Sequence, residues 1–189
     1  MKPRVLNDFY PTPQGITELL LDYVTLCNPI IEPCAGHNAI TKVLEDSNYV
    51  VHPYDLTWFD TGGFSTSDAT QELFWSERKK AHAIYWTVTN PPFSLAEKII
   101  PLAYEYSEVG IAMLLRLSYL EPTKGRADWL KEHADNLYKV IPVNPRVRFR
   151  ADTKGTDSIT CAWFCWSKYH SWHKLGLSSP FSFVTDWNS

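Results

Sequence analysis

The hydrophobic residues of this 189-residue chain follow two different spacings in turn. Near the N-terminus, Ile16, Leu20 and Tyr23 recur every three or four positions, which places them on one face of a helix. Segments such as 110–115 are almost continuously apolar, which is typical of a strand covered on both faces of a sheet. The alternation of these two patterns predicts an α/β fold.

The pattern predicts six strands and four helices. The strands cover residues 29–33, 49–54, 83–89, 110–115, 138–143 and 159–166, and the helices cover residues 16–26, 39–47, 95–106 and 124–135. Thr12 is the expected N-cap of the first helix, with Pro13 as its first helical residue. We expect a three-layer α/β sandwich in which a mostly parallel sheet ends in a late antiparallel β-hairpin.

Length and charge narrow the class of protein. Residues 1–189 fit one domain, with an aromatic-rich C-terminal tail at 170–189. The 18 Lys and Arg against 21 Asp and Glu give a net charge of −3, so any nucleic-acid contact must come from a local basic patch. No apolar run reaches the roughly 20 residues that span a bilayer, and the N-terminus lacks the apolar core of a secretion signal. We expect a soluble cytoplasmic protein without membrane contact.

The cysteines Cys27, Cys34, Cys161 and Cys165 form no C-x-x-C pair. This spacing gives little support to a zinc site, and we expect no metal. We interpret the four cysteines as reduced thiols that are mostly buried.

Residues suited to ligand binding follow the predicted strands, at the edge where α/β sheets hold their ligands. After the first strand, Gly36 supplies a turn residue without a Cβ, and the next helix offers free N–H groups to an anion. Asp55 ends the second strand, where an acid is well placed to accept hydrogen bonds from ribose hydroxyls. A glycine turn and a loop acid also occur without any function, so this pair alone does not assign one.

The most specific pattern is Asn90-Pro91-Pro92-Phe93, which follows the third predicted strand. The two prolines hold the chain extended and remove two donors, which leaves the Asn90 side-chain oxygen and the Pro91 carbonyl as acceptors. These acceptors suit both N–H groups of an amine on a planar ring, and the ring itself can stack on Phe93. Hydrogen bonds to both protons favour a pyramidal nitrogen and increase the electron density on it.

With these motifs in this order, the chain resembles the Rossmann-like S-adenosylmethionine-dependent amino-methyltransferases, and more narrowly the small DNA N6-adenine methyltransferases of phages and prophages. The similar segments, within roughly residues 7–168, are 9–13, 32–40, 115–121 and 162–166, together with Asp55 and the tetrapeptide 90–93. The resemblance implies S-adenosylmethionine as cofactor, DNA as partner and transfer of a methyl group to the N6 amine of adenine.

The resemblance also assigns roles to single residues. The methionine part of the cofactor would be surrounded by Tyr10, Thr12, Glu32, Cys34, Gly36 and Asn38. Asp55 would hold the ribose and Asp68 the cofactor adenine, although Asp68 also suits a loop or a helix N-cap. The target base would be held by Asn90, Pro91, Pro92 and Phe93.

Asn38 departs from the family pattern, because it stands where the motif has its second glycine. Asn is the residue that tolerates a left-handed conformation best after Gly, so we expect the turn to form. We also expect its side chain to crowd the cofactor.

A local basic patch is predicted near the C-terminal end. Residues 139–174 carry seven Lys and Arg against two acids. In an extended segment the three alternating arginines at 146–150 share one side. The expected DNA-binding residues are Arg116, Arg146, Arg148, Phe149, Arg150 and Lys154, where the cations contact phosphates and Phe149 stacks on a base. A solvated loop is the alternative.

Other functions stay open from sequence alone. The same chemistry suits RNA adenine, cytosine N4 or a protein amide, and Asn38 motivates a non-catalytic binding protein on the same scaffold. The chain has no room for a large recognition domain, so we expect short or modest sequence specificity, or reading by the loops at 57–70, 118–128 and 146–158. A homodimer would extend the DNA footprint, but no sequence feature establishes one.

Overall fold

Short apolar segments form the strands of one sheet in the computed structural model, which describes residues 11–57, 68–121, 123–147, 160–184 and 186–187. The strands are β1 (Ile30–Glu32), β2 (Val51–Pro53), β3 (Trp86–Thr89), β4 (Gly110–Arg116), β5 (Leu137–Pro142) and β6 (Cys161–Ser167). Their order across the sheet is β2-β1-β3-β4-β6-β5. The first four are parallel, and β6 pairs antiparallel with both β4 and β5, which confirms the predicted sheet and its late antiparallel pair.

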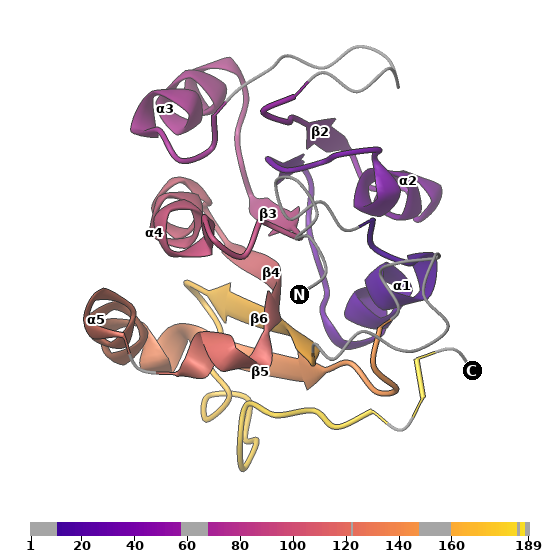
Figure 1. The fold of residues 1–189 in the computed structure, drawn as a ribbon, viewed down its shortest axis with the longest axis vertical. Helices are drawn as coiled ribbons and strands as arrows, with labels where there is room; N and C mark the ends of the chain where they lie inside the picture. The colour runs from indigo at the N-terminus through magenta and orange to yellow at the C-terminus, as the bar shows by residue number, and fades with distance from the viewer. Residues whose placement is uncertain (1–10, 58–67, 122, 148–159, 185, 188–189) are drawn as a thin grey trace, which may run out of the picture.

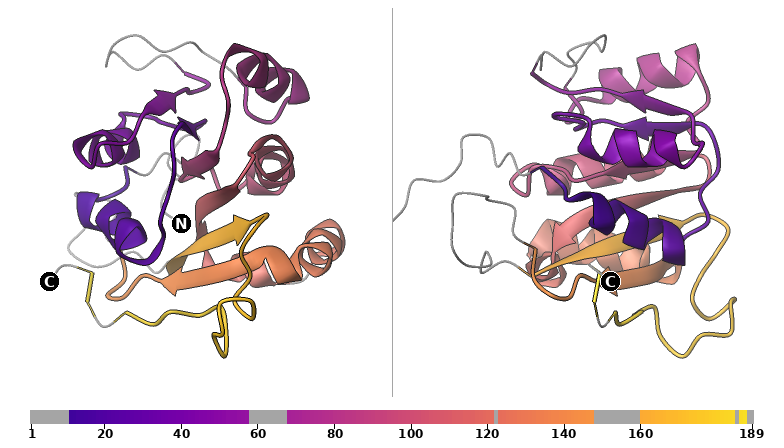
Figure 2. Two further views of the ribbon diagram at one scale, coloured as in Figure 1. Left: turned by 180° about the vertical axis from the view of Figure 1, so that it is seen from behind. Right: turned by 90° about the vertical axis from the view of Figure 1, so that its right-hand side faces the viewer.

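Helices cover both faces of this sheet. They are α1 (Gln14–Tyr23), α2 (Ala39–Asp46), α3 (Glu72–Ala81), α4 (Ala96–Tyr106) and α5 (Lys124–Glu132), with short 3-10 helices η2 (Leu117–Leu120) and η3 (Ala134–Asn136). Helices α1 and α2 lie on one face, and α3, α4 and α5 lie on the other (Figure 1). The views from behind and from the side show the same three layers (Figure 2). In the part of the chain that is described, none of the helices combines the length and the apolar character that a membrane crossing requires.

Two hydrophobic clusters fill the spaces between the layers. On β4, Ala112 and Leu114 belong to the cluster under α1 and α2, whereas Ile111, Met113 and Leu115 belong to the cluster under α4. All five side chains are almost completely buried. The continuous apolar run therefore reflects a central strand that packs on both faces, as predicted.

Helix α3 was not among the predicted helices. Only Phe74 and Trp75 are buried along it, so its apolar face is too narrow to produce a clear helical spacing. Its charges are the better signal: Glu72 lies in the first turn, and Arg78, Lys79 and Lys80 lie in the last turn, where each sign complements the helix dipole.

The start of α1 also differs from the prediction. Pro13 occupies the N-cap position with an extended backbone, and the helix begins at Gln14 without a side-chain cap. The expectation that Thr12 caps this helix is therefore wrong. The Thr12 hydroxyl instead accepts a hydrogen bond from Asn90, 78 residues away in sequence.

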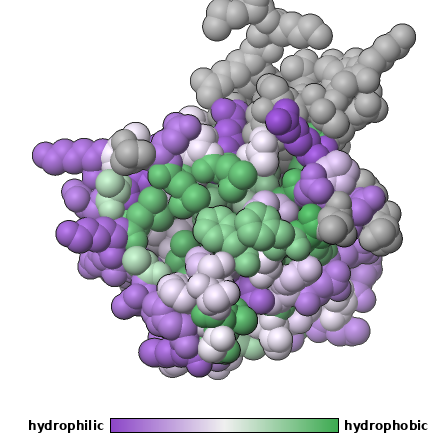
Figure 3. All heavy atoms as spheres, turned by 90° about the horizontal axis from the view of Figure 1, so that it is seen from below, coloured by the Kyte–Doolittle hydropathy of each residue, from purple (hydrophilic) through white to green (hydrophobic). Residues whose placement is uncertain are grey.

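The C-terminal tail packs on the exposed edge of β5. Val140 donates its N–H to the carbonyl of Pro180 at 2.8 Å, and Ser182 donates to the carbonyl of Val140 at 2.9 Å. Phe181 and Phe183 stack with ring centroids 6.0 Å apart and remain exposed. Apolar side chains are visible on this lower face of the molecule (Figure 3). The tail thus covers an edge strand that would otherwise present unpaired backbone groups.

The four cysteines are free thiols. Cys161 and Cys165 are buried in β6, Cys34 is half-buried, and Cys27 is exposed. The prediction of mostly buried thiols therefore does not hold for Cys27, which lies between α1 and β1 on the surface.

Candidate functional site

The candidate site lies where the chain reverses its direction of travel across the sheet. From β1, the chain goes first to β2 on one side and later to β3 on the other side, and both are parallel to β1. The carboxyl ends of β1 and β3 therefore form a topological switch point, which is the usual ligand site of an open α/β sheet. Ile31 is in register with Thr87, so residues 34 and 90 leave the two strands at the same level.

The turn after β1 has the backbone that its sequence predicts. Gly36 and Asn38 have φ values of 52° and 61°, in the left-handed region that Gly and Asn tolerate best. Asn38 donates its N–H to the carbonyl of Ala35 at 2.8 Å and is the N-cap residue of α2. The expectation that Asn38 keeps the turn is confirmed. Its side-chain Oδ1 is buried and has no hydrogen-bond partner among the described residues.

Asp55 is tied to this turn. Its Oδ2 accepts a hydrogen bond of 2.9 Å from the Gly36 N–H, and its Oδ1 accepts from the N–H and hydroxyl of Thr57 at 2.9 and 3.0 Å. The side chain is half-buried, and Oδ2 keeps a further lone pair, whereas Oδ1 already accepts two hydrogen bonds. The predicted ribose acid is thus next to the glycine turn and is held in a fixed orientation.

Glu32 is an unusual buried acid at the end of β1. Its carboxylate accepts a hydrogen bond from the Thr41 hydroxyl on α2. Burial raises the pKa of Glu32 from 4.5 to about 8, and the hydrogen bond from Thr41 offsets only part of this shift. The carboxyl group is therefore mainly protonated at neutral pH unless a positive charge comes close to it.

Cys34 lies close enough to the acidic residues of the site for their charges to act on its thiol. Burial raises the pKa of its thiol, and the nearby charges of Asp55, Glu32 and Asp68 act in the same direction, while the neighbouring Thr89 hydroxyl acts against them. A thiol with a raised pKa is a poor nucleophile at neutral pH. These interactions also show that Asp68 lies in the same neighbourhood as the turn after β1.

Asp68 closes a short turn before α3. Its Oδ1 accepts hydrogen bonds from the N–H and hydroxyl of Thr70 at 2.9 and 2.7 Å. These bonds lower the pKa of Asp68. Its local geometry is that of a loop acid before a helix, and its position near Cys34 is also compatible with a cofactor contact.

The tetrapeptide 90–93 leaves β3 beside this turn. Asn90 donates from Nδ2 to the Oγ1 of Thr12 at 3.1 Å, which directs Oδ1 to the opposite side of the amide. Pro91 is buried, whereas Pro92 and Phe93 are half-buried. The carbonyl of Pro92 accepts from the Leu95 N–H at 2.8 Å and leads the chain into α4. Thr12 therefore orients the side chain that the sequence predicts to be catalytic.

Arg116 extends the site on the side of β4. Its guanidinium group lies 4.3 Å from the centre of the Phe93 ring, a cation–π contact. Arg116 is one of the residues predicted to bind DNA, and the structure brings it to the aromatic residue of the tetrapeptide.

The predicted basic patch is only partly described. Arg146 is exposed and Val147 is buried, which agrees with an alternating segment after β5. Tyr10, Arg148, Phe149, Arg150 and Lys154 lie outside the described residues.

Sequence reasoning missed residues that contribute to the site through other elements. Thr41 on α2 donates to Glu32, and Arg126 on α5 binds Glu97 of α4 behind the tetrapeptide. A polar residue within the apolar face of α2 is the only local signal for Thr41. Arg126 has no local signal, because it belongs to a charged helix without buried residues.

Comparison with known proteins gives the fold class. No protein-family model and no curated protein matches the chain. The methyltransferase subunit of a type I restriction-modification system from Streptococcus thermophilus has a similar structure, with a TM-score of 0.62 and 11% identity over 93% of this chain and 47% of that one. The M protein of the type I restriction enzyme EcoKI has a TM-score of 0.59 and 14% sequence identity, and the match covers 89% of this chain and 44% of that one. A SAM-dependent methyltransferase from Archaeoglobus fulgidus has a TM-score of 0.54 and 10% sequence identity, and the match covers 82% of this chain and 92% of that one.

This chain spans about half the length of the restriction-modification subunits that it matches, 47% and 44% of them. At identities of 10–14% the similarity concerns the fold. The chain therefore has the Rossmann-like fold of S-adenosylmethionine-dependent methyltransferases, with its candidate site at the switch point of the sheet.

Proposed function

We propose that this protein transfers a methyl group from S-adenosylmethionine to the exocyclic N6 amine of adenine in DNA. The observation that carries the proposal is the position of Asn90-Pro91-Pro92-Phe93 at the carboxyl end of β3, beside the Gly36 turn of β1, with the Asn90 amide fixed by Thr12. The restriction-modification subunits of similar fold support DNA as the substrate.

The residues of the turn fit the cofactor. Oδ1 of Asn38 is buried without a partner in the described part of the chain, so a ligand that donates a hydrogen bond would satisfy it. Glu32, Cys34, Gly36 and Asn38 would surround the methionine part, together with Thr12. Asp55 would accept from the ribose, and Asp68 would bind the adenine amine. A cation beside Glu32 would lower its raised pKa and favour the carboxylate.

When bound, the cofactor supplies a methyl group on a sulfonium, which needs no metal ion and no covalent enzyme intermediate. The protein residues position the acceptor. Oδ1 of Asn90 and the carbonyl of Pro91 accept the two N–H bonds of the adenine amine, and Phe93 stacks on the ring. Orientation of two reactants in this way can supply about 7–11 kcal/mol. In duplex DNA the base must first be extruded, which costs a few kcal/mol.

The test is incubation of the protein with labelled S-adenosylmethionine and single-stranded DNA, duplex DNA or RNA, followed by identification of the methylated base. We expect N6-methyladenine in DNA. Asn90→Ala should abolish transfer while the protein still binds the cofactor in calorimetry. Label in RNA, in cytosine or in protein would replace the proposed substrate with one of these, and full activity of Asn90→Ala would remove Asn90 from its role. Absence of cofactor binding at millimolar concentration would indicate a non-catalytic protein.

A further inference from the structure

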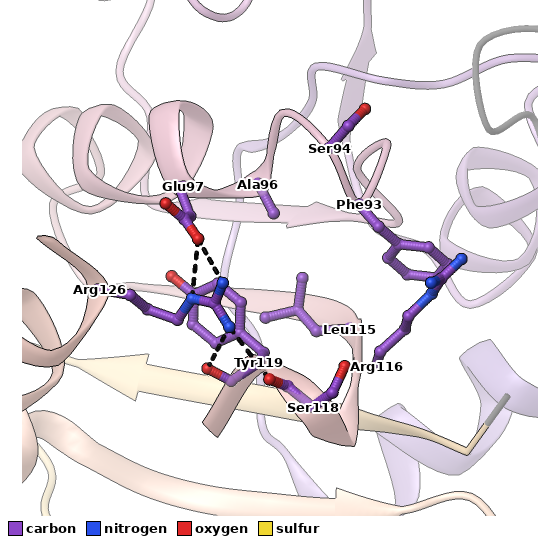
Figure 4. Close-up of a pocket in the computed structure, with 9 residues that line it drawn as sticks. All are labelled: Phe93, Ser94, Ala96, Glu97, Leu115, Arg116, Ser118, Tyr119 and Arg126. Carbon is purple, nitrogen blue, oxygen red and sulfur yellow. Dashed lines mark hydrogen bonds and ion pairs between the residues drawn. The ribbon is translucent and has the colours of Figure 1, made fainter. Parts of the chain in front are cut away.

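A cavity of about 170 Å³ opens behind the tetrapeptide, between the start of α4 and η2 (Figure 4). Ala96 and Leu115 form an apolar floor, and Phe93 lies at one end. Asn90 does not line it, nor do Pro91 and Pro92. The cavity therefore adjoins the proposed target-base site through Phe93 but is a different space.

The size and walls of this cavity suit a planar ring. An engineered cavity of about 150 Å³ holds one benzene ring, so about 170 Å³ accommodates a ring system of the size of a base. Phe93 and Tyr119 are the aromatic residues of the lining, with the guanidinium groups of Arg116 and Arg126 lying 4.3 and 5.0 Å from their ring centres. The hydroxyl of Ser118 provides a polar group that can donate or accept. Base–aromatic stacking contributes about 1–3 kcal/mol per base in proteins that bind single strands.

The two arginines of the cavity have different surroundings. Arg126 donates to the carboxylate of Glu97 and to the carbonyls of Ser118 at 3.0 Å and Tyr119 at 3.2 Å. It is thus a fixed part of the wall. Arg116 makes its contact with the face of Phe93, and its Nε is buried without a hydrogen-bond partner among the described residues. Arg116 is therefore the cation that retains donors for an anionic ligand.

We propose that the cavity binds the base of the nucleotide next to the target adenine, and that Arg116 binds the phosphate that links the two nucleotides. The proposal rests on the proposed function, because only a nucleic-acid strand brings a second base and a phosphate beside the first. The cavity meets the proposed target-base site at Phe93, so consecutive nucleotides of one strand can occupy the two spaces without both stacking on that ring, one face of which carries Arg116. This subsite would give the domain itself a short sequence preference.

The first experiment removes the flanking base. Oligonucleotides with an abasic residue on one side of the target, on the other side, or several nucleotides away are compared as substrates of residues 1–189. We expect kcat/KM to fall roughly 5–150-fold when the base on one flank is missing, because this factor corresponds to a stacking contribution of about 1–3 kcal/mol. A missing base at the distant position should change kcat/KM less than about twofold. Equal rates on all abasic substrates would overturn the proposal.

The second experiment fills the cavity. Ser118→Phe should lower kcat/KM on normal DNA by a similar factor and make the enzyme insensitive to the abasic flank. Ser47→Phe at the exposed C-terminal end of α2 is the matched control and should keep the wild-type pattern. A Ser118→Phe variant that is still sensitive to the abasic flank would contradict occupancy of the cavity by that base.

Arg116 is tested by the salt dependence of DNA binding. Arg116→Gln should reduce the slope of log K against log salt by about one unit, and Arg116→Lys should restore it. An unchanged slope in Arg116→Gln would exclude the phosphate contact.

Binding of oligonucleotides with 2-aminopurine at the flanking position separates the two proposals, because it needs no chemistry. Quenching of the 2-aminopurine fluorescence that occurs with the wild type and is lost with Ser118→Phe supports the subsite even if no methyl transfer occurs. Methyl transfer to adenine without any flank effect would leave the proposed function intact and overturn the subsite.

Discussion

The hydrogen bond between Thr12 and Asn90 gives the sharpest test of the site. Oγ1 of Thr12, which is 5% exposed, accepts from Nδ2 of Asn90 at 3.1 Å. Thr12→Val keeps the branched shape but removes the acceptor. A hydrogen bond of this kind contributes about 1 kcal/mol net, and its loss removes one of the contacts that orient the half-buried amide.

We expect kcat to fall roughly 5–10-fold in Thr12→Val, because about 1–1.4 kcal/mol of acceptor positioning is lost. The assay measures initial methyl-transfer rates at saturating cofactor and DNA, so that a change in cofactor affinity does not enter kcat. Calorimetry of cofactor binding and thermal unfolding are recorded on the same samples.

Thr17→Val is the matched control, because Thr17 is fully buried on α1 and its Oγ1 has no hydrogen-bond partner in the described chain. Its kcat should equal that of the wild type, and its stability should be equal or slightly higher. The orientation argument is refuted if Thr12→Val keeps the wild-type kcat, or if Thr17→Val loses as much activity.

Three further predictions concern buried groups. Because the folded pKa of Glu32 is raised from 4.5 to about 8, the folded state binds the proton more tightly, so the free energy of unfolding should decrease as pH rises through this window; Glu32→Gln should flatten that part of the urea-denaturation profile. Asn38→Gly removes a buried oxygen that has no partner among the described residues, and it puts glycine at a position with a φ of 61°. The free energy of unfolding of the ligand-free protein, measured by thermal unfolding, should therefore rise by about 1 kcal/mol. Calorimetry should show roughly 5–10-fold weaker cofactor binding, because the hydrogen bond from the ligand to Oδ1 is lost. Gly110→Ala places a Cβ 2.4 Å from the Trp166 carbonyl oxygen and should cost about 1–3 kcal/mol or more, whereas Gly125→Ala in α5 meets no atom within 4 Å and should stabilise by about 0.5–1 kcal/mol.

Each of these has a contrary outcome. A Glu32→Gln profile parallel to the wild type would mean that this carboxyl does not carry the pH dependence. Tighter cofactor binding by Asn38→Gly would show that the side chain crowds the ligand instead of contacting it. Equal stability of the two glycine variants would contradict the close approach of β4 and β6 at Gly110.

The local features of this protein follow from its amino-acid sequence. The spacing of apolar residues gave the α/β class and the buried strand β4, because periodicity reports directly which faces of an element are covered. Turn chemistry gave the left-handed positions Gly36 and Asn38, and the tetrapeptide at 90–93 could be placed at a strand end because proline restricts the backbone locally. Helix α3 was missed because it buries only two large side chains.

Which of these local features meet depends on long-range packing. The placement of β3 beside β1 brings the tetrapeptide to the glycine turn, and it depends on packing between residues more than 50 positions apart. The contacts of Thr12 with Asn90 and of Arg116 with Phe93, and the cavity beside them, likewise arise between separate elements. Backbone periodicity carries no information on such pairs, because the packing of whole layers, and not local conformation, sets their distance.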